Sequence, residues 1–326
     1  MQSKRIEIPI FFSCDDNYIP FLSVAIHSLI ENADKRYDYA IYILNSGLKK
    51  ENEARILLQE RENVKIRFKN VRAEARSLGK QLNLRDYYTA AIYFRIFIPD
   101  LFGKYKKAIY LDSDITVTGD ISKLYFTELR DDLVGAVSDD VIASRDVFIR
   151  YAERGCGIEY RKYFNSGVLL MNLELMREED LTGRFIRLMK KYGFDTVCPD
   201  QDYLNALCRD RVLYLDRGWN KMSVDKNYDG IPNIIHFNMF NKPWQYDEVP
   251  YGEYFWKYAE QSDFYGDILK IKESFGKEEI EEQEKGLLEL ISNAERIANS
   301  DVNFRTVLFP EDGSLSCGYD LGAISV

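Results

Sequence analysis

The chain has 326 residues, 46% of them hydrophobic, which is enough to bury one large domain or a domain with an appendage. Its formal net charge of −9 would repel a phosphate backbone, and no cluster of Lys and Arg stands out, so the composition argues against nucleic acid as a partner. The five cysteines are widely spread and never form a C-x-x-C pair, which favours reduced thiols over a disulfide framework or a zinc site.

The sequence contains no run of about 18 or more apolar residues, as a transmembrane helix would need. The apolar stretch near the start, in MQSKRIEIPIFFSC, is too short and too polar for a secretory signal. We therefore expect a cytoplasmic, soluble protein without a transmembrane segment. Residues 251–300 are acidic, whereas helices that dock on anionic lipid are basic, so the sequence gives no support for membrane association.

The first half of the chain alternates strand-like apolar runs with helical patterns, which predicts an α/β fold with a mostly parallel sheet. The predicted strands are 6–14, 39–47, 64–71 and 106–111, and the predicted helices are 19–32, 48–61 and 89–102. Later apolar runs predict further strands of the same sheet at 133–139, 166–173, 211–215 and 233–237, with one long amphipathic helix at 173–193. We divide the chain into a domain at 1–250, a helical appendage at 251–300 and a tail of unknown structure at 301–326.

Two acids follow the strand in KKAIYLDSD. Asp112 and Asp114 are two positions apart, so on an extended chain they point to the same side, and open α/β sheets bind ligands at the carboxyl ends of their strands. Two carboxylates held that close repel each other unless a proton or a cation lies between them, and a divalent metal is the simpler explanation. The alternative is that both residues only turn the chain after the strand.

The chain has two histidines. His27 lies within the apolar pattern of a predicted helix, where a packed histidine is expected. His236 closes the apolar run NIIHF and therefore lies at a strand end like the two acids, although it could also be a structural residue. Two carboxylates and one imidazole suit Mn²⁺, whose preferences lie between those of Mg²⁺ and Zn²⁺, and three protein ligands leave positions for phosphate oxygens.

Polar residues at other element ends are further candidates. Asp15 and Asn17 follow the first strand, where they either face the same crevice or form an Asx turn. Asn165, Ser166 and Gly167 precede an apolar strand and either line a pocket or form an ordinary turn.

Two more candidates lie on predicted helices. Asp200 is a natural N-cap, and Gln201 and Asp202 follow it in the first helical turn. Arg95 interrupts an otherwise apolar helix, and a guanidinium in such a place needs a carboxylate or a phosphate as its partner.

Six motifs in chain order resemble glycosyltransferase family 8, which comprises retaining galactosyl- and glucosyltransferases related to lipopolysaccharide-core enzymes and glycogenin. The motifs are FSCDDNYIPFLSVAIHSL, AAIYFRIFIPDLF, KAIYLDSDITVTGDI, YFNSGVLLMNL, DQDYLN and HFNMFNKPW. The resemblance extends from about residue 6 to residue 250 and implies a GT-A fold. It also implies a metal-dependent retaining hexosyltransferase that moves glucose or galactose from a UDP-sugar to a saccharide or glycoconjugate acceptor.

The resemblance assigns roles to the candidate residues. It implies that Asp112, Asp114 and His236 bind Mn²⁺, with Mg²⁺ as the other possible ion. It implies contacts from Asp15 and Asn17 to the uridine and from Lys242 to the phosphates, and it counts Ser113, between the two acids, among the donor-binding residues. The residues that it places around the donor hexose are Arg95, Asn165, Asp200 and Gln201.

Retention of configuration ordinarily uses a carboxylate nucleophile, but at the matching position of this family the chain has the amide Gln201, a poor nucleophile. We therefore expect the acceptor hydroxyl to attack on the same face as departing UDP, with a β-phosphate oxygen taking its proton. Asp202 stays open as an alternative nucleophile.

One position departs from the family loop H-x-x-G-x-x-K-P-W, because Met239 stands where the family has a glycine. Glycine adopts a positive φ at little cost, whereas methionine does not. We therefore expect closure of this loop over the diphosphate to differ.

Two other functions are compatible with an acid pair and a metal. One is a metal-dependent nucleotide-sugar hydrolase or nucleotidyltransferase, although the sequence has no G-x-x-x-x-G-K-[ST] loop. The other is a UDP-sugar binder without catalytic activity, although the intact acids, His236 and Gln201 argue against it.

Overall fold

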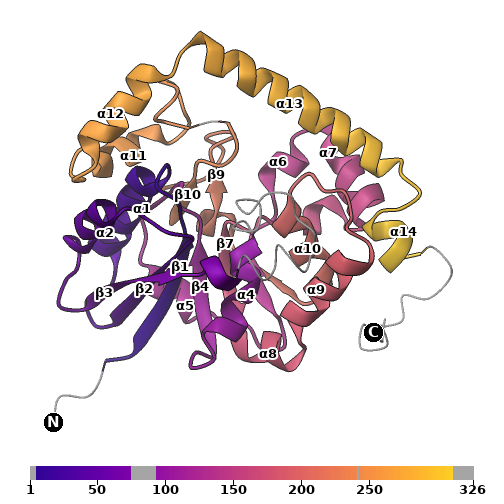
Figure 1. The fold of residues 1–326 in the computed structure, drawn as a ribbon, viewed down its shortest axis with the longest axis horizontal. Coiled ribbons are helices and arrows are strands. Elements are labelled where there is room, and N and C mark those ends of the chain that lie inside the picture. The colour runs from indigo at the N-terminus through magenta and orange to yellow at the C-terminus, as the bar shows by residue number, and fades with distance from the viewer. Residues whose placement is uncertain (1–4, 75–92, 241, 311–326) are drawn as a thin grey trace.

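The computed structural model describes residues 5–74, 93–240 and 242–310. At its centre is a seven-stranded sheet with the order β3-β2-β1-β4-β7-β6-β8 (Figure 1). Only β7 is antiparallel to its neighbours β4 and β6, so the sheet is mostly parallel, as predicted. The strands are β1 (Glu7–Ser13), β2 (Asp38–Asn45), β3 (Val64–Asn70), β4 (Lys107–Leu111), β6 (Val134–Ala136), β7 (Val168–Asn172) and β8 (Val212–Tyr214).

Both faces of the sheet are covered, which explains why the inner strands β1, β2, β4 and β7 are nearly continuous buried runs. Alternate residues of β1 point to opposite faces, so Phe11 joins one hydrophobic core while Ile10 and Phe12 join the other. The core around Phe11 includes side chains of α4 (Phe94–Leu101), α8 (Leu173–Glu178), α9 (Leu181–Lys191) and α10 (Pro199–Leu207). The opposite core includes side chains of α1 (Ile19–Asn32), α2 (Lys50–Leu57) and α5 (Ile121–Tyr125).

One edge of the sheet collects the polar residues that follow or precede its strands. Because β1, β4 and β6 run in the same direction, Asp15, Asp112 and Asp139 come after the carboxyl ends of their strands at the same edge. Because β7 runs the opposite way, the segment before it, with Asn165 and Gly167, lies at this edge too. The topology therefore brings together residues that are far apart in the sequence.

A second, three-stranded sheet has the order β5-β10-β9, with β5 (Ile115–Val117), β9 (Lys221–Met222) and β10 (Ile234–His236). The prediction that residues 233–237 add a strand to the main sheet is therefore wrong. The chain leaves the main sheet after Asp112, and β5 then pairs antiparallel with β10, so that His236 lies opposite Ile115. The N–H of Phe237 also donates a 2.9 Å hydrogen bond to the carbonyl of Asp114, which fixes His236 beside that acid.

The prediction of one long helix at 173–193 is also wrong, because the chain forms two helices, α8 and α9, with a break between them. Asp180, at the break, has a φ of 48°, a left-handed conformation that cannot continue an α-helix and that Asp tolerates better than most residues. Both helices bury apolar residues in the same core, so the apolar periodicity of the sequence continues through the break.

The C-terminal region is helical, with α11 (Gly252–Ala259), α12 (Tyr265–Ser274), α13 (Lys277–Ala298) and α14 (Phe304–Leu308). α11 and α12 pack on α1, and Trp244 just ahead of them stacks on Phe21 of α1 at 3.8 Å between ring centroids. α13 passes over the opposite part of the molecule, where it contacts α7 (Asp146–Arg150) and the π-helical turn η2 (Tyr151–Cys156) (Figure 1). Whether the chain divides into domains at residue 250 stays a prediction.

Parts of two predicted segments lie outside the described residues. They are residues 89–92 of the helix that is observed from Phe94 onward, and residues 311–326 of the tail. In the described part of the chain, every helix is too short or too polar to cross a membrane.

Candidate functional site

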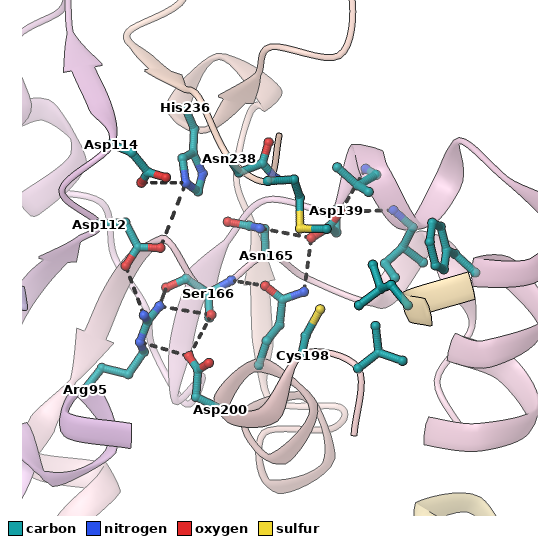
Figure 2. Close-up of a pocket in the computed structure, with 17 residues that line it drawn as sticks. Arg95, Asp112, Asp114, Asp139, Asn165, Ser166, Cys198, Asp200, His236 and Asn238 are labelled. Atoms are coloured by element: carbon teal, nitrogen blue, oxygen red, sulfur yellow. Dashed lines mark hydrogen bonds and ion pairs between the residues drawn. The ribbon is translucent and has the colours of Figure 1, made fainter. Parts of the chain in front are cut away.

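Asp112, Asp114 and His236 converge at the junction of the two sheets (Figure 2). Nε2 of His236 is 3.3 Å from Oδ1 of Asp114 and 3.9 Å from Oδ2 of Asp112. One ligand atom from each residue lies within 4.8 Å of the others. His236 is only 2% exposed, so its ring is held in place by the surrounding structure. These three residues form the predicted metal-ligand set.

The hydrogen bonds of Asn220 fix the tautomer of His236. The side-chain amide nitrogen of Asn220 donates a 2.9 Å hydrogen bond to Oδ1 of Asn165, so its oxygen faces Nδ1 of His236, also at 2.9 Å. Nδ1 is therefore the protonated nitrogen, and Nε2 directs its lone pair at the two carboxylates. A lone pair and two carboxylates facing one point repel one another unless a cation joins them, so these residues fit a divalent metal.

Lys242 neutralises one of the acids. Its ammonium group donates hydrogen bonds to Oδ2 of Asp114 and, at 2.5 Å, to the carbonyl of Phe237. Burial alone would raise the pKa of Asp114, but the ammonium of Lys242 outweighs burial and holds that pKa below its ordinary value. Burial likewise opposes the charge of Lys242, and Asp114 raises the pKa of Lys242 in spite of it. Asp114 is therefore ionised at neutral pH, as a metal ligand needs to be.

Arg95 connects the metal-ligand set to α10. Its guanidinium contacts Oδ1 of Asp112 at 3.0 Å, Oδ2 of Asp200 at 2.9 Å and the carbonyl of Ser166 at 2.7 Å. It also lies over the ring of Tyr110, 4.3 Å from the centroid. The prediction that this buried guanidinium needs a carboxylate partner is confirmed, and it has two. Burial raises the pKa of Asp200 even though Arg95 opposes that rise.

The amide of Gln201 is held at both ends. Its oxygen accepts a 2.8 Å hydrogen bond from the backbone N–H of Ser166, and its nitrogen donates a 3.1 Å hydrogen bond to Oδ2 of Asp139. The same oxygen of Asp139 accepts a 2.9 Å hydrogen bond from the amide of Asn165. A continuous hydrogen-bonded chain thus runs from His236 through its neighbouring amides to Gln201, which fixes the orientation of every amide in it.

These residues line a cavity of about 260 Å³. The charged and polar lining residues are Arg95, Asp112, Asp114, Asp139, Asn165, Ser166, Asp200, Gln201, His236 and Asn238. The remaining lining residues are Val141, Ile142, Phe148, Val197, Cys198, Met239 and Leu290. A metal-ligand set thus opens onto a space in which amides and acids surround a ligand of modest size.

Comparison with known proteins identifies the family. The model of glycosyl transferase family 8 matches residues 9–248. The chain belongs to glycosyltransferase family 8. Among curated proteins, it is 30% identical over 280 residues to general stress protein A of Bacillus subtilis, covering 78% of this chain and 94% of that protein. It is 28% identical to a lipopolysaccharide 1,2-glucosyltransferase of Escherichia coli, covering 74% of each.

Solved structures of glycosyltransferases share the fold. The bifunctional glycosyltransferase WbbM superposes with a TM-score of 0.72 at 26% identity, over 84% of this chain and 53% of that one. The galactosyltransferase LgtC, solved with donor and acceptor sugar analogues, superposes with a TM-score of 0.64 at 24% identity, over 78% of this chain and 96% of that one. The predicted family and the predicted α/β GT-A fold are both confirmed, and the chain is a glycosyltransferase.

Most of the predicted site residues of this family 8 enzyme lie together. The predicted residues that line the cavity are Arg95, Asp112, Asp114, Asn165, Asp200, Gln201 and His236. The four predicted donor-binding residues outside the cavity lining are Asp15, Asn17, Ser113 and Lys242. Lys242 contacts Asp114, as described above.

The other three lie where β1 and β4 end. Ser113 donates a 2.9 Å hydrogen bond to the carbonyl of Ser13, and so ties the end of β4 to the end of β1. Asp15 accepts hydrogen bonds from the N–H groups of Asn17 and Tyr18, so the Asx turn considered for this loop is present. Donor binding by Asp15, Asn17 and Ser113 stays a prediction.

Three further residues shape the site in ways that the sequence motifs did not identify. Asp139 follows β6 just as Asp112 follows β4, so the same strand-end pattern could have found it. The sequence left open whether Gly167 lines a pocket or forms an ordinary turn. A Cβ there would lie 2.3 Å from Cε1 of His236 and 2.7 Å from Oδ2 of Asp112, so the missing side chain makes room for both. Asn220 belongs to no recognisable motif, and only the folded chain brings it to His236.

Two open questions from the sequence receive answers. Asp202 is fully buried and accepts hydrogen bonds from the hydroxyls of Tyr151 at 2.7 Å and Tyr163 at 2.5 Å, and it is not among the residues that line the cavity. This position argues against Asp202 as a nucleophile.

Met239 has a φ of 57°, so the backbone keeps the left-handed conformation expected of the glycine that it replaces, at a cost of about 1 kcal/mol.

Proposed function

We propose that this glycosyltransferase transfers glucose or galactose, with retention, from a UDP-sugar to a hydroxyl of a saccharide or glycoconjugate in the cytoplasm. The observation that carries the proposal is the Asp112, Asp114 and His236 ligand set at one side of a cavity that also presents the amide of Gln201. The names of the relatives support the choice of hexose, because one is a glucosyltransferase and another is a galactosyltransferase.

The three ligands would hold Mn²⁺, or Mg²⁺, and the bound cation would supply Lewis-acid stabilisation of the charge on departing UDP. Lys242 adds a second positive charge on this side of the cavity, because its ammonium already lies at Asp114. A diphosphate bound here would compete with Asp114 for the N–H donors of Lys242. Arg95 bridges Asp112 and Asp200 and offsets part of their negative charge, which limits their repulsion of the donor phosphates.

The hydrogen bonding around Gln201 supports attack from the face of the leaving group. Asp139 receives four hydrogen bonds, Asp200 is paired with Arg95 and Ser166, and Asp202 faces the core, so none of these three carboxylates is available as a nucleophile. The bond from the sugar to UDP would break as the bond to the acceptor oxygen forms, and the acceptor proton would pass to a β-phosphate oxygen. Gln201, with its dipole fixed, would lie beside the positively charged sugar centre.

The test is a screen of UDP-sugars with Mn²⁺ for release of UDP, with and without saccharide acceptors, repeated with Asp114→Ala and His236→Ala. Matched controls are the exposed acid in Asp131→Ala and the second histidine of the chain in His27→Gln. We expect both site variants to lose metal-dependent release and both controls to keep it.

Three results would contradict the proposal. Release of UDP that no acceptor stimulates would indicate a hydrolase, and tight binding of a UDP-sugar without any turnover would indicate a binding protein. Full metal-dependent activity of both site variants would show that the metal-ligand set is wrong.

A further inference from the structure

The cavity changes character from one side to the other. Arg95, Asp112, Asp114 and His236 gather on one side, and Asp139 lies toward the other, where a yellow segment of α13 passes (Figure 2). Beyond Asp139 the lining residues carry only hydrocarbon side chains. We call this part the apolar wall, and it consists of Val141, Ile142, Phe148, Val197 and Leu290.

The apolar wall is assembled from four segments of the chain. Val141 and Ile142 come from α6 (Asp140–Ala143), Phe148 from α7, Val197 from the segment before α10, and Leu290 from α13. Ile142 and Phe148 are also buried members of a hydrophobic cluster, and Val141, Val197 and Leu290 pack on that cluster while staying half-buried. The wall is therefore the cavity-facing side of a packed core and not a set of mobile surface side chains.

Contacts near both ends of α13 hold this helix, and with it Leu290, at the cavity. Near its start, Gln283 accepts a 2.8 Å hydrogen bond from the hydroxyl of Tyr246 and donates one of 3.1 Å to Gln245, close to the loop that carries Lys242. Near its end, Arg296 forms a 2.7 Å ion pair with Asp195, ahead of α10, and Ala294 and Ile297 are buried in the cluster behind the wall. The position of Leu290 is thus set by contacts to both sides of the site.

The arrangement restricts what can bind at the wall. A diphosphate and a cation belong with the charged side, because Arg95 and the metal-ligand set gather there, whereas the apolar wall carries no charge. An acceptor hydroxyl must reach the sugar that the donor presents beside Gln201, so the rest of the acceptor extends past Asp139. The surface that it meets there offers methyl groups and a ring, without a hydrogen-bond donor or acceptor in the wall side chains.

We propose that the apolar wall is the acceptor subsite and that its ligand is a glycoside with an apolar aglycone, such as an alkyl or aryl group. The inference rests on the proposed function and adds the chemistry of the acceptor to it. The sugar hydroxyls of the acceptor would lie toward Asp139 and Asn165, and its aglycone would cover Leu290 and Val141. Burial of that aglycone would remove apolar surface of both partners from water.

The experiment compares methyl and octyl β-glycosides of glucose and galactose, kept below the micelle concentration, in two ways. One is kcat/KM with the active sugar nucleotide, and the other is binding measured by NMR line broadening in the presence of UDP and Mn²⁺. We expect the octyl glycosides to be favoured by about tenfold or more, through KM rather than kcat, as is typical of a hydrophobic subsite.

Three variants locate the effect. Leu290→Asn should remove most of the preference for the octyl glycoside, and Val141→Thr, which keeps the side-chain shape, should weaken it. Leu288→Asn changes a side chain of the same helix that is 67% exposed, and it should leave the preference intact. Leu288→Asn should also leave KM for the sugar nucleotide and release of UDP without acceptor unchanged, and thermal unfolding shows whether all three variants are folded.

The outcomes separate this inference from the proposed function. Equal binding of methyl and octyl glycosides, or equal effects of Leu290→Asn and Leu288→Asn, would overturn the acceptor subsite while UDP release still supports the transferase. If no sugar nucleotide is turned over, the proposed function fails, and the NMR comparison still decides whether the wall binds apolar glycosides.

Discussion

Asn220 accepts a 2.9 Å hydrogen bond from Nδ1 of His236 and donates one of the same length to Asn165. This pair sets the tautomer of His236 and the direction of its Nε2, and it begins the hydrogen-bonded chain that continues through Asp139 to Gln201. A side chain outside the cavity lining therefore orients one of the three proposed metal ligands.

Replacement of Asn220 should weaken metal binding although none of the three proposed ligand residues is changed. In Asn220→Leu the Nδ1 proton loses its acceptor, so the ring can change tautomer or rotate, and we expect the Kd for Mn²⁺ to rise by about 10–100-fold. Asn220→Asp keeps an acceptor for His236 and should lose less. Titration of Mn²⁺ followed by electron paramagnetic resonance, without donor, measures the effect, and equal affinities in the parent and Asn220→Leu would contradict it.

Because Gly167 has no side chain, the side chains of His236 and Asp112 have room to lie beside it. A Cβ at this position would lie 2.3 Å from Cε1 of His236 and 2.7 Å from Oδ2 of Asp112, so Gly167→Ala must displace one ligand or the strand end. We expect kcat/KM to fall by about a hundredfold, because displacements of about 1 Å in a catalytic site have effects of that size.

The matched control for this change is Gly266→Ala in α12, where a Cβ would meet nothing within 4 Å. It should keep full activity, and its stability should be equal to the parent or slightly higher, because Ala favours a helix more than Gly does. Full activity of Gly167→Ala would show that the ligands have more room than the structure gives them.

Asp202 makes the stability of the fold depend on pH. Burial raises its pKa from 3.8 to about 6, although hydrogen bonds from Tyr163 and Tyr151 act in the opposite direction. The folded state therefore binds this proton more tightly than the unfolded state does. The contribution of Asp202 to the free energy of unfolding is fully present below the unfolded-state pKa and is lost as the pH rises through about 6.

The comparison with Asp202→Asn isolates this effect, because the amide does not titrate. We expect the free energy of unfolding of the parent, relative to that of the variant, to fall by roughly 2–3 kcal/mol between about pH 4 and about pH 7. Denaturant titrations at several pH values measure it. If the difference between the two proteins is constant across this range, Asp202 is ionised throughout and the prediction is wrong.

Local patterns were sufficient for the elements that lie within the main sheet and its covering helices. The helix predicted at 19–32 is observed as α1, because Pro20 fits a first turn and the apolar pattern ends with the helix. The strand predicted at 64–71 is likewise observed as β3, whose sequence VKIRFKN alternates apolar and charged residues as a strand with one buried face does. The two acids of the site were found because they follow such a strand.

The remainder depends on contacts between distant parts of the chain, which spacing along a sequence does not reveal. Residues 233–237 look like any buried strand, and only their pairing with β5 separates them from the main sheet. The break at Asp180 is invisible to periodicity because both flanking helices face one core. Asn220 and Leu290 reach the site through tertiary packing alone, so no local motif marks either of them.

The backbone of Met239 already has the left-handed conformation expected of the glycine that it replaces. With φ at 57°, the loop needs no rearrangement to take up glycine, so Met239→Gly should change the Kd for UDP by about threefold at most. Met239→Val should weaken UDP binding much more, since a β-branched residue resists the left-handed region and would pull the loop out of shape. Calorimetric titration of both variants with UDP and Mn²⁺ distinguishes a conformational requirement from a requirement for glycine itself. A large gain in affinity for Met239→Gly alone would show that the methionine side chain, which lines the cavity, obstructs the diphosphate.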